Sequence, residues 1–167
     1  MDKLNLGGII KESIVDGPGI RFVLFAQGCR HNCPGCFNQE LQAFRKNTIY
    51  TVSQVLDMID ALPHLDGITL SGGDPFEQAD AFGELAKACR SRRLNIWAYT
   101  GYTFEELIAD PEYRILLEEI DVLVDGPFLF EEKDPLLPFR GSRNQRIIDV
   151  QSSLLSAPNV RLIRTTN

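Results

Sequence analysis

Three cysteines and one histidine crowd into nine residues of this chain, in the segment GCRHNCPGC at 28–36. Cys29, Cys33 and Cys36 have the spacing C-x3-C-x2-C, and the fourth cysteine, Cys89, lies far along the chain. A disulfide across so short a loop would be strained and would leave an odd thiol, so reduced thiols that hold a metal are the better interpretation. Structural zinc usually takes four ligands, often as two separated pairs, and those pairs are missing. A four-iron cluster held by three thiolates keeps one iron open for a substrate.

The cysteine loop directly follows an expected strand at 20–28, because IRFVLFAQG is a continuous apolar run that ends in glycine. Strand and helix patterns then alternate, which predicts a parallel sheet with helical crossovers. The expected strands are 67–75, 94–101 and 120–127, with weaker candidates at 145–150 and 160–164, and the expected helices are 51–62, 77–93 and 103–119, the last interrupted at Pro111. Ligands of such sheets gather at the carboxyl ends of the strands, where the cysteine loop lies.

Length and charge restrict the classes of function. A chain of 167 residues has the size of one domain, so we expect a single domain over residues 1–167. That length falls short of the roughly 250 residues of a complete (β/α)8 barrel. A net charge of −6 argues against broad attraction to nucleic acid or to an anionic membrane. Since no segment approaches about 18 consecutive apolar residues and no signal-peptide pattern opens the chain, we expect a cytoplasmic protein without a membrane anchor.

The cysteine spacing after the first buried strand is similar to the signature of the radical S-adenosylmethionine superfamily. The resemblance implies a partial, open (β/α) barrel with one [4Fe-4S] cluster on Cys29, Cys33 and Cys36. It also implies that S-adenosylmethionine chelates the open iron, and that the reduced cluster splits it into methionine and a 5'-deoxyadenosyl radical. An alternative of another class is a non-catalytic assembly module, in which the three cysteines and a remote histidine bind zinc.

A glycine turn at the end of the second expected strand supports the resemblance. The segment SGGDP at 71–75 resembles the superfamily's GGE motif, whose backbone holds the methionine amino group, although aspartate replaces the usual glutamate. Glycine suits that place because the chain must come close to the ligand. Many relatives carry an aromatic residue over the adenine just before the last cysteine, where this chain has Gly35, and we expect Phe37, directly after that cysteine, to substitute partly for it. The implied cofactor contacts are Gly35, Phe37, Gly72, Gly73 and Asp74.

Other polar residues near these motifs have two interpretations each. Arg140, Arg143 and Arg146 recur at every third position, either as a solvated basic loop or as an anion site for the carboxylate of S-adenosylmethionine or an acidic patch on a partner. Asp125 follows the fourth expected strand and either orients a ribose or partner backbone, or caps the next turn.

Three residues have a plain structural interpretation. His31 and Asn32 are expected to be exposed loop residues that close turns. Cys89, without a partner nearby in the sequence, is expected to be a buried helix residue that packs as a small apolar side chain.

Four further stretches narrow the resemblance to activases of glycyl radical enzymes. IVDGPGIR at 14–21 looks like their segment before the first strand, and the other three stretches resemble the activating proteins of anaerobic ribonucleoside-triphosphate reductases: YTGYTFEEL at 99–107, DVLVDGPF at 121–128 and LPFRGSRNQRIIDV at 137–150. The resemblance implies hydrogen abstraction from a glycine of the reductase large subunit, with flavodoxin or a similar protein as electron donor. Another glycyl radical enzyme, such as pyruvate formate-lyase, is the alternative target.

Overall fold

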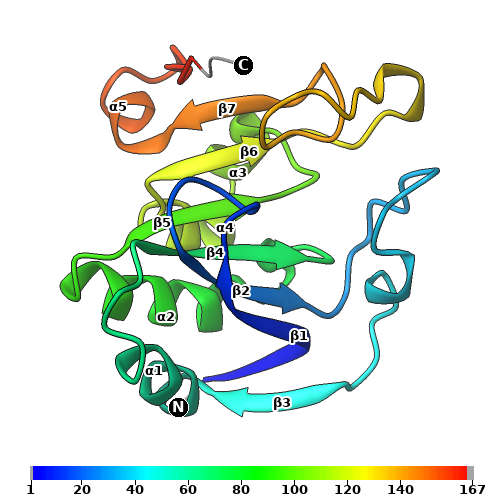
Figure 1. Ribbon diagram of the computed structural model, residues 1–167. Helices are drawn as coiled ribbons and strands as arrows, with labels where there is room; N and C mark the ends of the chain where they lie inside the picture. The colour runs from blue at the N-terminus through cyan, green and yellow to red at the C-terminus, as the bar shows by residue number, and fades with distance from the viewer. Residues whose placement is uncertain (1, 165–167) are drawn as a thin grey trace.

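The computed structural model describes residues 2–164, which form one seven-stranded mixed sheet (Figure 1). Its order is β3-β1-β2-β4-β5-β6-β7, with β2, β4, β5 and β6 parallel and with β1, β3 and β7 added in antiparallel pairs. The strands are β1 (Lys3–Ser13), β2 (Arg21–Ala26), β3 (Thr48–Thr51), β4 (Gly67–Gly72), β5 (Asn95–Tyr99), β6 (Val122–Asp125) and β7 (Arg146–Asp149). Because β3 and β7 stand at opposite ends of this order, the sheet is open.

Within residues 2–164, five α-helices and three short 3-10 helices accompany the strands, and all but α5, which follows β7, lie between two strands. They are α1 (Val52–Asp60), α2 (Ala79–Ser91), α3 (Phe104–Ala109), α4 (Pro111–Leu117), α5 (Val150–Leu155), η1 (Gln39–Leu41), η2 (Pro75–Gln78) and η3 (Phe130–Glu132). The side chain of Asp110 accepts a hydrogen bond from the backbone N of Glu112, and this cap together with Pro111 begins α4 as a separate helix. Among residues 2–164, no helix is both long and apolar enough to cross a membrane.

The expected α/β fold, a partial open (β/α) barrel, is confirmed by the four parallel strands and their connecting helices. The strands predicted at 20–28, 67–75, 94–101, 120–127 and 145–150 are present, and the segment 103–119 divides at Pro111 as expected. The weak candidate at 160–164 is not a strand, since it contributes only an isolated bridge between Ile148 and Leu162. The sequence patterns did not predict β1 and β3, which extend the sheet beyond β2.

The sheet packs apolar side chains on both faces. Ile96 and Ala98 belong to the large cluster that includes residues of the helices, whereas Trp97 of the same strand packs on the other face with Val124 and Ile147. This alternation is the period of two expected for a strand.

The segment before β2, which contains the DGPG sequence, crosses this second face. Arg21 is 1 % exposed, lies over the ring of Trp97 at 5.7 Å, and donates through Nε to Thr69 Oγ1 at 2.8 Å. Burial lowers the pKa of Arg21 to about 10. Thr69 in turn donates to the backbone O of Asp16 at 2.6 Å, which holds the segment against the sheet.

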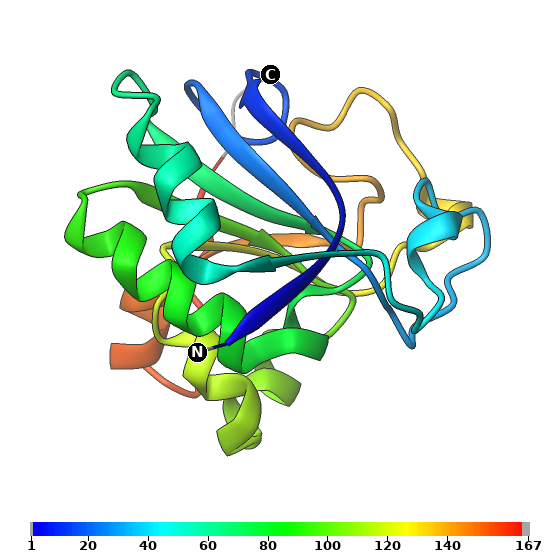
Figure 2. The ribbon, with the colours of Figure 1, turned by 90° about the horizontal axis from the view of Figure 1, so that it is seen from below.

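Two long connections project from the carboxyl end of the parallel strands. One carries the cysteine loop after β2, and the other joins β6 to β7 through residues 126–145. Figures 1 and 2 show them side by side at the right of both views. The two connections are in contact, because the ring centroids of Phe37 and Phe128 lie 5.2 Å apart.

Candidate functional site

A cavity of about 410 Å³ lies between these two connections, at the carboxyl ends of the parallel strands. That volume is within the usual range for small-ligand sites. The cysteine loop and the end of β4 form one side, and residues 126–145 contribute Phe128 and Arg140 to the other. The sequence-predicted residues that the cavity brings together are Cys29, Cys33, Cys36, Phe37, Gly72 and Gly73.

The three cysteines are held by turns immediately beyond β2. The backbone N of Cys29 donates to Gln42 O at 3.0 Å, and the backbone N of Cys36 donates to Cys33 O at 3.2 Å. The backbone N of Asn38 donates to Cys36 Sγ at 3.4 Å, the kind of contact that tunes a metal–thiolate centre. All three cysteines are free thiols on one cavity wall, so the donor set fits a cluster with three cysteine ligands.

The other cysteine and the remote histidine lie elsewhere. Cys89 is fully buried in α2, as expected, and burial raises its pKa to about 12. His64 pairs with Glu12 and does not line the cavity.

Burial also raises the pKa of the Cys29 thiol in the cavity, to about 11, so a metal centre that binds this thiol must displace its proton.

The glycine turn at the end of β4 packs directly against the start of the cysteine loop. Gly72 has a φ of +109°, a left-handed conformation that favours glycine. The backbone N of Gly73 donates to Ala26 O at 2.8 Å, and a Cβ on Gly73 would lie 2.4 Å from Gly28 O. Both glycines therefore bring backbone, without side chains, to the cavity beside the thiols.

The remaining implied cofactor contacts occupy different places. Phe37 lines the cavity and is 65 % exposed. Gly35 and Asp74 do not line it. A Cβ on Gly35 would lie 2.7 Å from Phe130 Cδ2, and Asp74 is fully buried behind the cavity wall.

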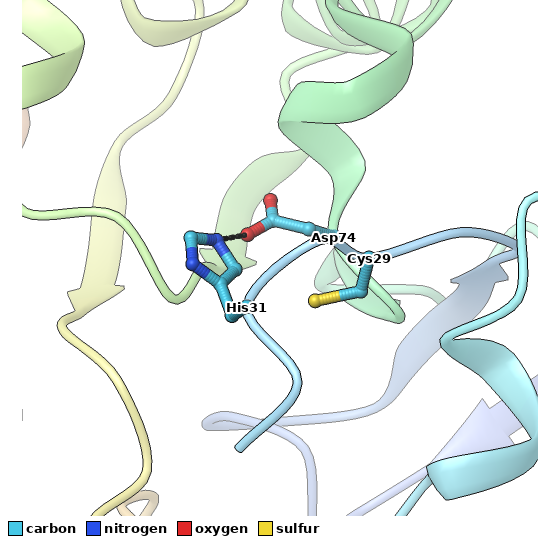
Figure 3. A group of neighbouring side chains, drawn as sticks. All are labelled: Cys29, His31 and Asp74. Carbon is cyan, nitrogen blue, oxygen red and sulfur yellow. Dashed lines mark hydrogen bonds and ion pairs between the residues drawn. The ribbon is translucent and has the colours of Figure 1, made fainter.

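His31 corrects the expectation that it is an exposed loop residue. Its side chain is 15 % exposed, its Nε2 lies 2.9 Å from Asp74 Oδ2, and its ring meets that of Tyr102 edge-on at 4.3 Å (Figure 3). Burial alone would lower the pKa of His31, but the hydrogen bond to Asp74 and nearby carboxylates raise it above its ordinary value. Asn32 is exposed with a φ of +52°, as expected for a turn residue.

Arg146 is tied into the fold. Its Nη2 lies 2.6 Å from Asp125 Oδ2 and 2.6 Å from Glu105 Oε1, and these hydrogen bonds raise its pKa. Asp125 is 1 % exposed and accepts a further hydrogen bond from the backbone N of Phe104 at 2.8 Å. Asp125 thus supports the first turn of α3, a helix that precedes β6 in the chain, and not the turn after β6 that the sequence suggested it caps.

The other two arginines face solvent or the site. Arg140 lines the cavity, and its Nη1 donates to Gln145 O at 3.1 Å. Arg143 is exposed and forms no ion pair within residues 2–164. Beside β7, a second cavity of about 500 Å³ is lined by the arginines at 140, 143, 146 and 164.

Comparison with known proteins agrees with this geometry. A family described as a 4Fe-4S single cluster domain matches residues 15–148, so fold and site define an α/β protein with one [4Fe-4S] cluster. More narrowly, the chain belongs to the family of anaerobic ribonucleoside-triphosphate reductase-activating proteins. The protein of that name from Vibrio cholerae is 41 % identical over 80 % of this chain and 90 % of its own length.

Two further relatives carry the same name. The protein from Haemophilus influenzae is 39 % identical over 80 % of this chain and 90 % of its own length, and that from Enterobacteria phage T4 is 33 % identical over 86 % and 93 %. The relationship expected from the sequence motifs is confirmed by these relatives. Among solved structures, QueE from Escherichia coli aligns with 60 % of this chain and 53 % of its own, with a TM-score of 0.46 and 14 % identity.

Proposed function

We propose that this protein activates an anaerobic ribonucleoside-triphosphate reductase by forming a glycyl radical on its large subunit. The observation that carries the proposal is that three free thiols and the Gly72–Gly73 backbone line one cavity in a member of a 4Fe-4S activating-protein family. Cys29, Cys33 and Cys36 hold the cluster and form the catalytic centre. When bound, the cluster supplies the electron that cleaves S-adenosylmethionine, and the cleaved cofactor removes a hydrogen atom from a glycine of the reductase.

The chain's own residues position the cofactor around the thiols. Gly72 and Gly73 present backbone at the cavity wall to the methionine amino group, and Phe37 provides an aromatic face for the adenine. Gly35 and Asp74 do not line the cavity, so we infer that they act on its walls, Asp74 from its buried position and Gly35 from the exposed part of the cysteine loop. Arg140 does line it, and its guanidinium suits the carboxylate of S-adenosylmethionine.

The mouth of the cavity suits a protein substrate. Val15 and Phe37 line the cavity and are 74 % and 65 % exposed, and Phe130 nearby is 60 % exposed. Exposed apolar side chains around a functional opening are typical of a protein-docking rim. A glycine-containing loop of the reductase fits such a rim. We infer that residues 1–167 act as one domain in the cytoplasm, with flavodoxin or a similar protein as electron donor.

The direct test is anaerobic. After cluster reconstitution and reduction, S-adenosylmethionine is added with and without the reductase, and 5'-deoxyadenosine and the glycyl radical signal are measured. We expect 5'-deoxyadenosine in both cases and a radical signal on the reductase. Radical formation on pyruvate formate-lyase alone would favour the alternative target. Colourless protein that contains zinc and no sulfide would favour the assembly module.

The arginine-lined cavity beside β7 predicts where acidic residues of the reductase dock. Arg146 is neutralised by Asp125 and Glu105, but the other three arginines of this hollow, at 140, 143 and 164, make a local basic surface on a protein with net charge −6. Arg143→Glu should raise the KM for the reductase about tenfold and leave 5'-deoxyadenosine formation without reductase unchanged. The matched control is Arg93→Glu, an exposed arginine after α2. Equal KM values for the two variants would contradict this docking surface.

A further inference from the structure

Two consecutive residues of the cysteine loop dock onto two carboxylates of the turn that follows β4. The Nε of Arg30 lies 2.6 Å from Glu77 Oε2, and Nε2 of His31 lies 2.9 Å from Asp74 Oδ2. The side chains of Asp74 and Glu77 are 0 % and 2 % exposed; the His31 side chain is itself 15 % exposed, whereas that of Arg30 stays 63 % exposed and reaches Glu77 from the surface. These contacts join the loop that carries the thiols to the turn that carries Gly72 and Gly73.

The His31 side chain packs closely between the residues that follow β4 and those that follow β5. A Cβ on Gly101 would lie 2.4 Å from His31 Cδ2, so the imidazole rests directly on the Gly101 backbone. The ring of Tyr102 meets it edge-on at 4.3 Å, while the hydroxyl of Tyr102 donates to Glu77 at 2.6 Å. The same acidic turn thus anchors the histidine and the tyrosine that packs on it.

The Asp74 carboxylate is held in place by several hydrogen bonds. Its carboxylate accepts hydrogen bonds from Thr100 Oγ1 at 2.8 Å, from the Gly101 backbone N at 3.0 Å and from the Phe76 backbone N at 3.0 Å. Because an ionised carboxylate only accepts, Nε2 of His31 is the donor of the fourth bond. Buried, fully partnered networks of this kind hold their members in one geometry.

The cysteine loop needs such an anchor because regular structure gives it little support. Between Cys29 and Cys36 the backbone N–H groups donate to backbone oxygens only at the two ends, to Gln42 and Cys33. Within this segment, two side chains, those of Arg30 and His31, form the ion pairs that tie it to the turn after β4. Figure 3 shows His31 and Cys29 projecting from the same loop, on either side of Asp74.

We propose that His31 and Asp74 form a clamp that sets the cysteine loop against the Gly72–Gly73 turn, so that cluster and cofactor face each other. The clamp rests on the proposed function, since it positions the cluster's thiols. His31 is a positioning residue, because it acts through the loop on Cys29. Asp74 serves the site by holding His31, which explains why a buried carboxylate follows the two glycines.

The clamp also contributes charge near the cluster. The Cys29 thiol, the His31 imidazole and the Asp74 carboxylate are close neighbours, since one N, O or S atom of each lies within 4.8 Å of those of the other two. The His31 N–H compensates the negative charge of Asp74, and neighbouring charges and hydrogen bonds set the reduction potential of such a cluster. Removing His31 should therefore make the cluster harder to reduce, and neutralising Asp74 should make it easier.

The first experiment measures cluster retention in reconstituted protein challenged anaerobically with an iron chelator. His31→Ala and Gly101→Ala should each release iron at least about tenfold faster than wild type, since loss of an outer support typically weakens a metal site 10- to 100-fold. His31→Gln, which keeps an N–H donor, should restore part of the retention. The matched control is His64→Ala, which removes the other histidine–carboxylate pair and should release iron at the wild-type rate.

A double variant distinguishes the clamp from general loosening of the fold. Gly101→Ala acts by pushing the imidazole out, so it should have no further effect once His31 is alanine. Additive losses in His31→Ala/Gly101→Ala would overturn the clamp. Thermal unfolding of the cluster-free variants shows whether the fold itself is retained.

Redox titration supplies a second readout that a purely mechanical role would not produce. His31→Ala should lower the midpoint potential and Asp74→Asn should raise it, and a shift of both in the same direction would overturn the charge argument. A wild-type cluster that all variants retain equally would overturn the clamp alone. Wild-type protein that takes up no iron and sulfide would overturn the proposed function and the clamp together.

Discussion

Cys33→Ala is expected to abolish both the [4Fe-4S] cluster and the cleavage of S-adenosylmethionine. Three thiols line the cavity, and two remaining thiolates leave a second iron without a protein ligand. The loss should exceed that of an outer-support variant, with 5'-deoxyadenosine formation falling below about 1 % of wild type. Iron and sulfide content after anaerobic reconstitution and 5'-deoxyadenosine yield are the measurements.

The matched control for this variant is Cys89→Ala. Cys89 is fully buried in α2 among apolar side chains, away from the cavity. Its truncation should lower the free energy of unfolding by about 1 kcal/mol and leave the cluster intact. Normal cleavage by Cys33→Ala, or loss of the cluster in Cys89→Ala, would contradict the three-cysteine assignment.

The fold was predictable where burial leaves a clear mark on the sequence. Strand β2 is covered on both faces, so it has a continuous apolar run, and β4, β5 and β6 have similar runs. Strand β1 lacks that mark because its sequence KLNLGGIIKES mixes buried, glycine and exposed positions. Strand β3 is only four residues long and lies at the sheet edge, where packing demands little of its side chains.

The candidate site was predictable to the extent that sequence order reflects sheet order. The cysteine loop and the glycine turn follow β2 and β4, which are neighbours in the sheet, so their meeting at one cavity follows from the topology. His31 and Asp74 are 43 positions apart in the sequence. Their contact depends on the directions of the two side chains, which no hydrophobic periodicity in the sequence predicts. The pairing of Arg146 was not predictable either. Arg146 belongs to a regular arginine pattern in the sequence, but it pairs with Asp125 on the neighbouring antiparallel strand.

Gly72→Ala is expected to destabilise the protein far more than a second glycine substitution with the same backbone strain. Gly72 and Gly126 have φ values of +109° and +97°, and each stands at the carboxyl end of a parallel strand. Alanine in this left-handed region costs about 1–2 kcal/mol at either position. A Cβ on Gly72 would also lie 2.2 Å from Ala26 N and 2.6 Å from Ala26 O, whereas one on Gly126 would meet only Asn144 Nδ2 at 3.7 Å.

The clash at Gly72 involves backbone, so it is relieved only if β4 and β2 separate at the end that carries the site. Overpacking of this kind adds about 3 kcal/mol to the backbone strain. Urea unfolding of the cluster-free proteins should therefore show Gly126→Ala about 1–2 kcal/mol below wild type and Gly72→Ala about 4–5 kcal/mol below it. Equal losses would mean that strain alone demands glycine at position 72. The predicted difference would mean that the glycine is required for the close approach of the two strands, which is what brings the thiols and the glycine turn to one cavity.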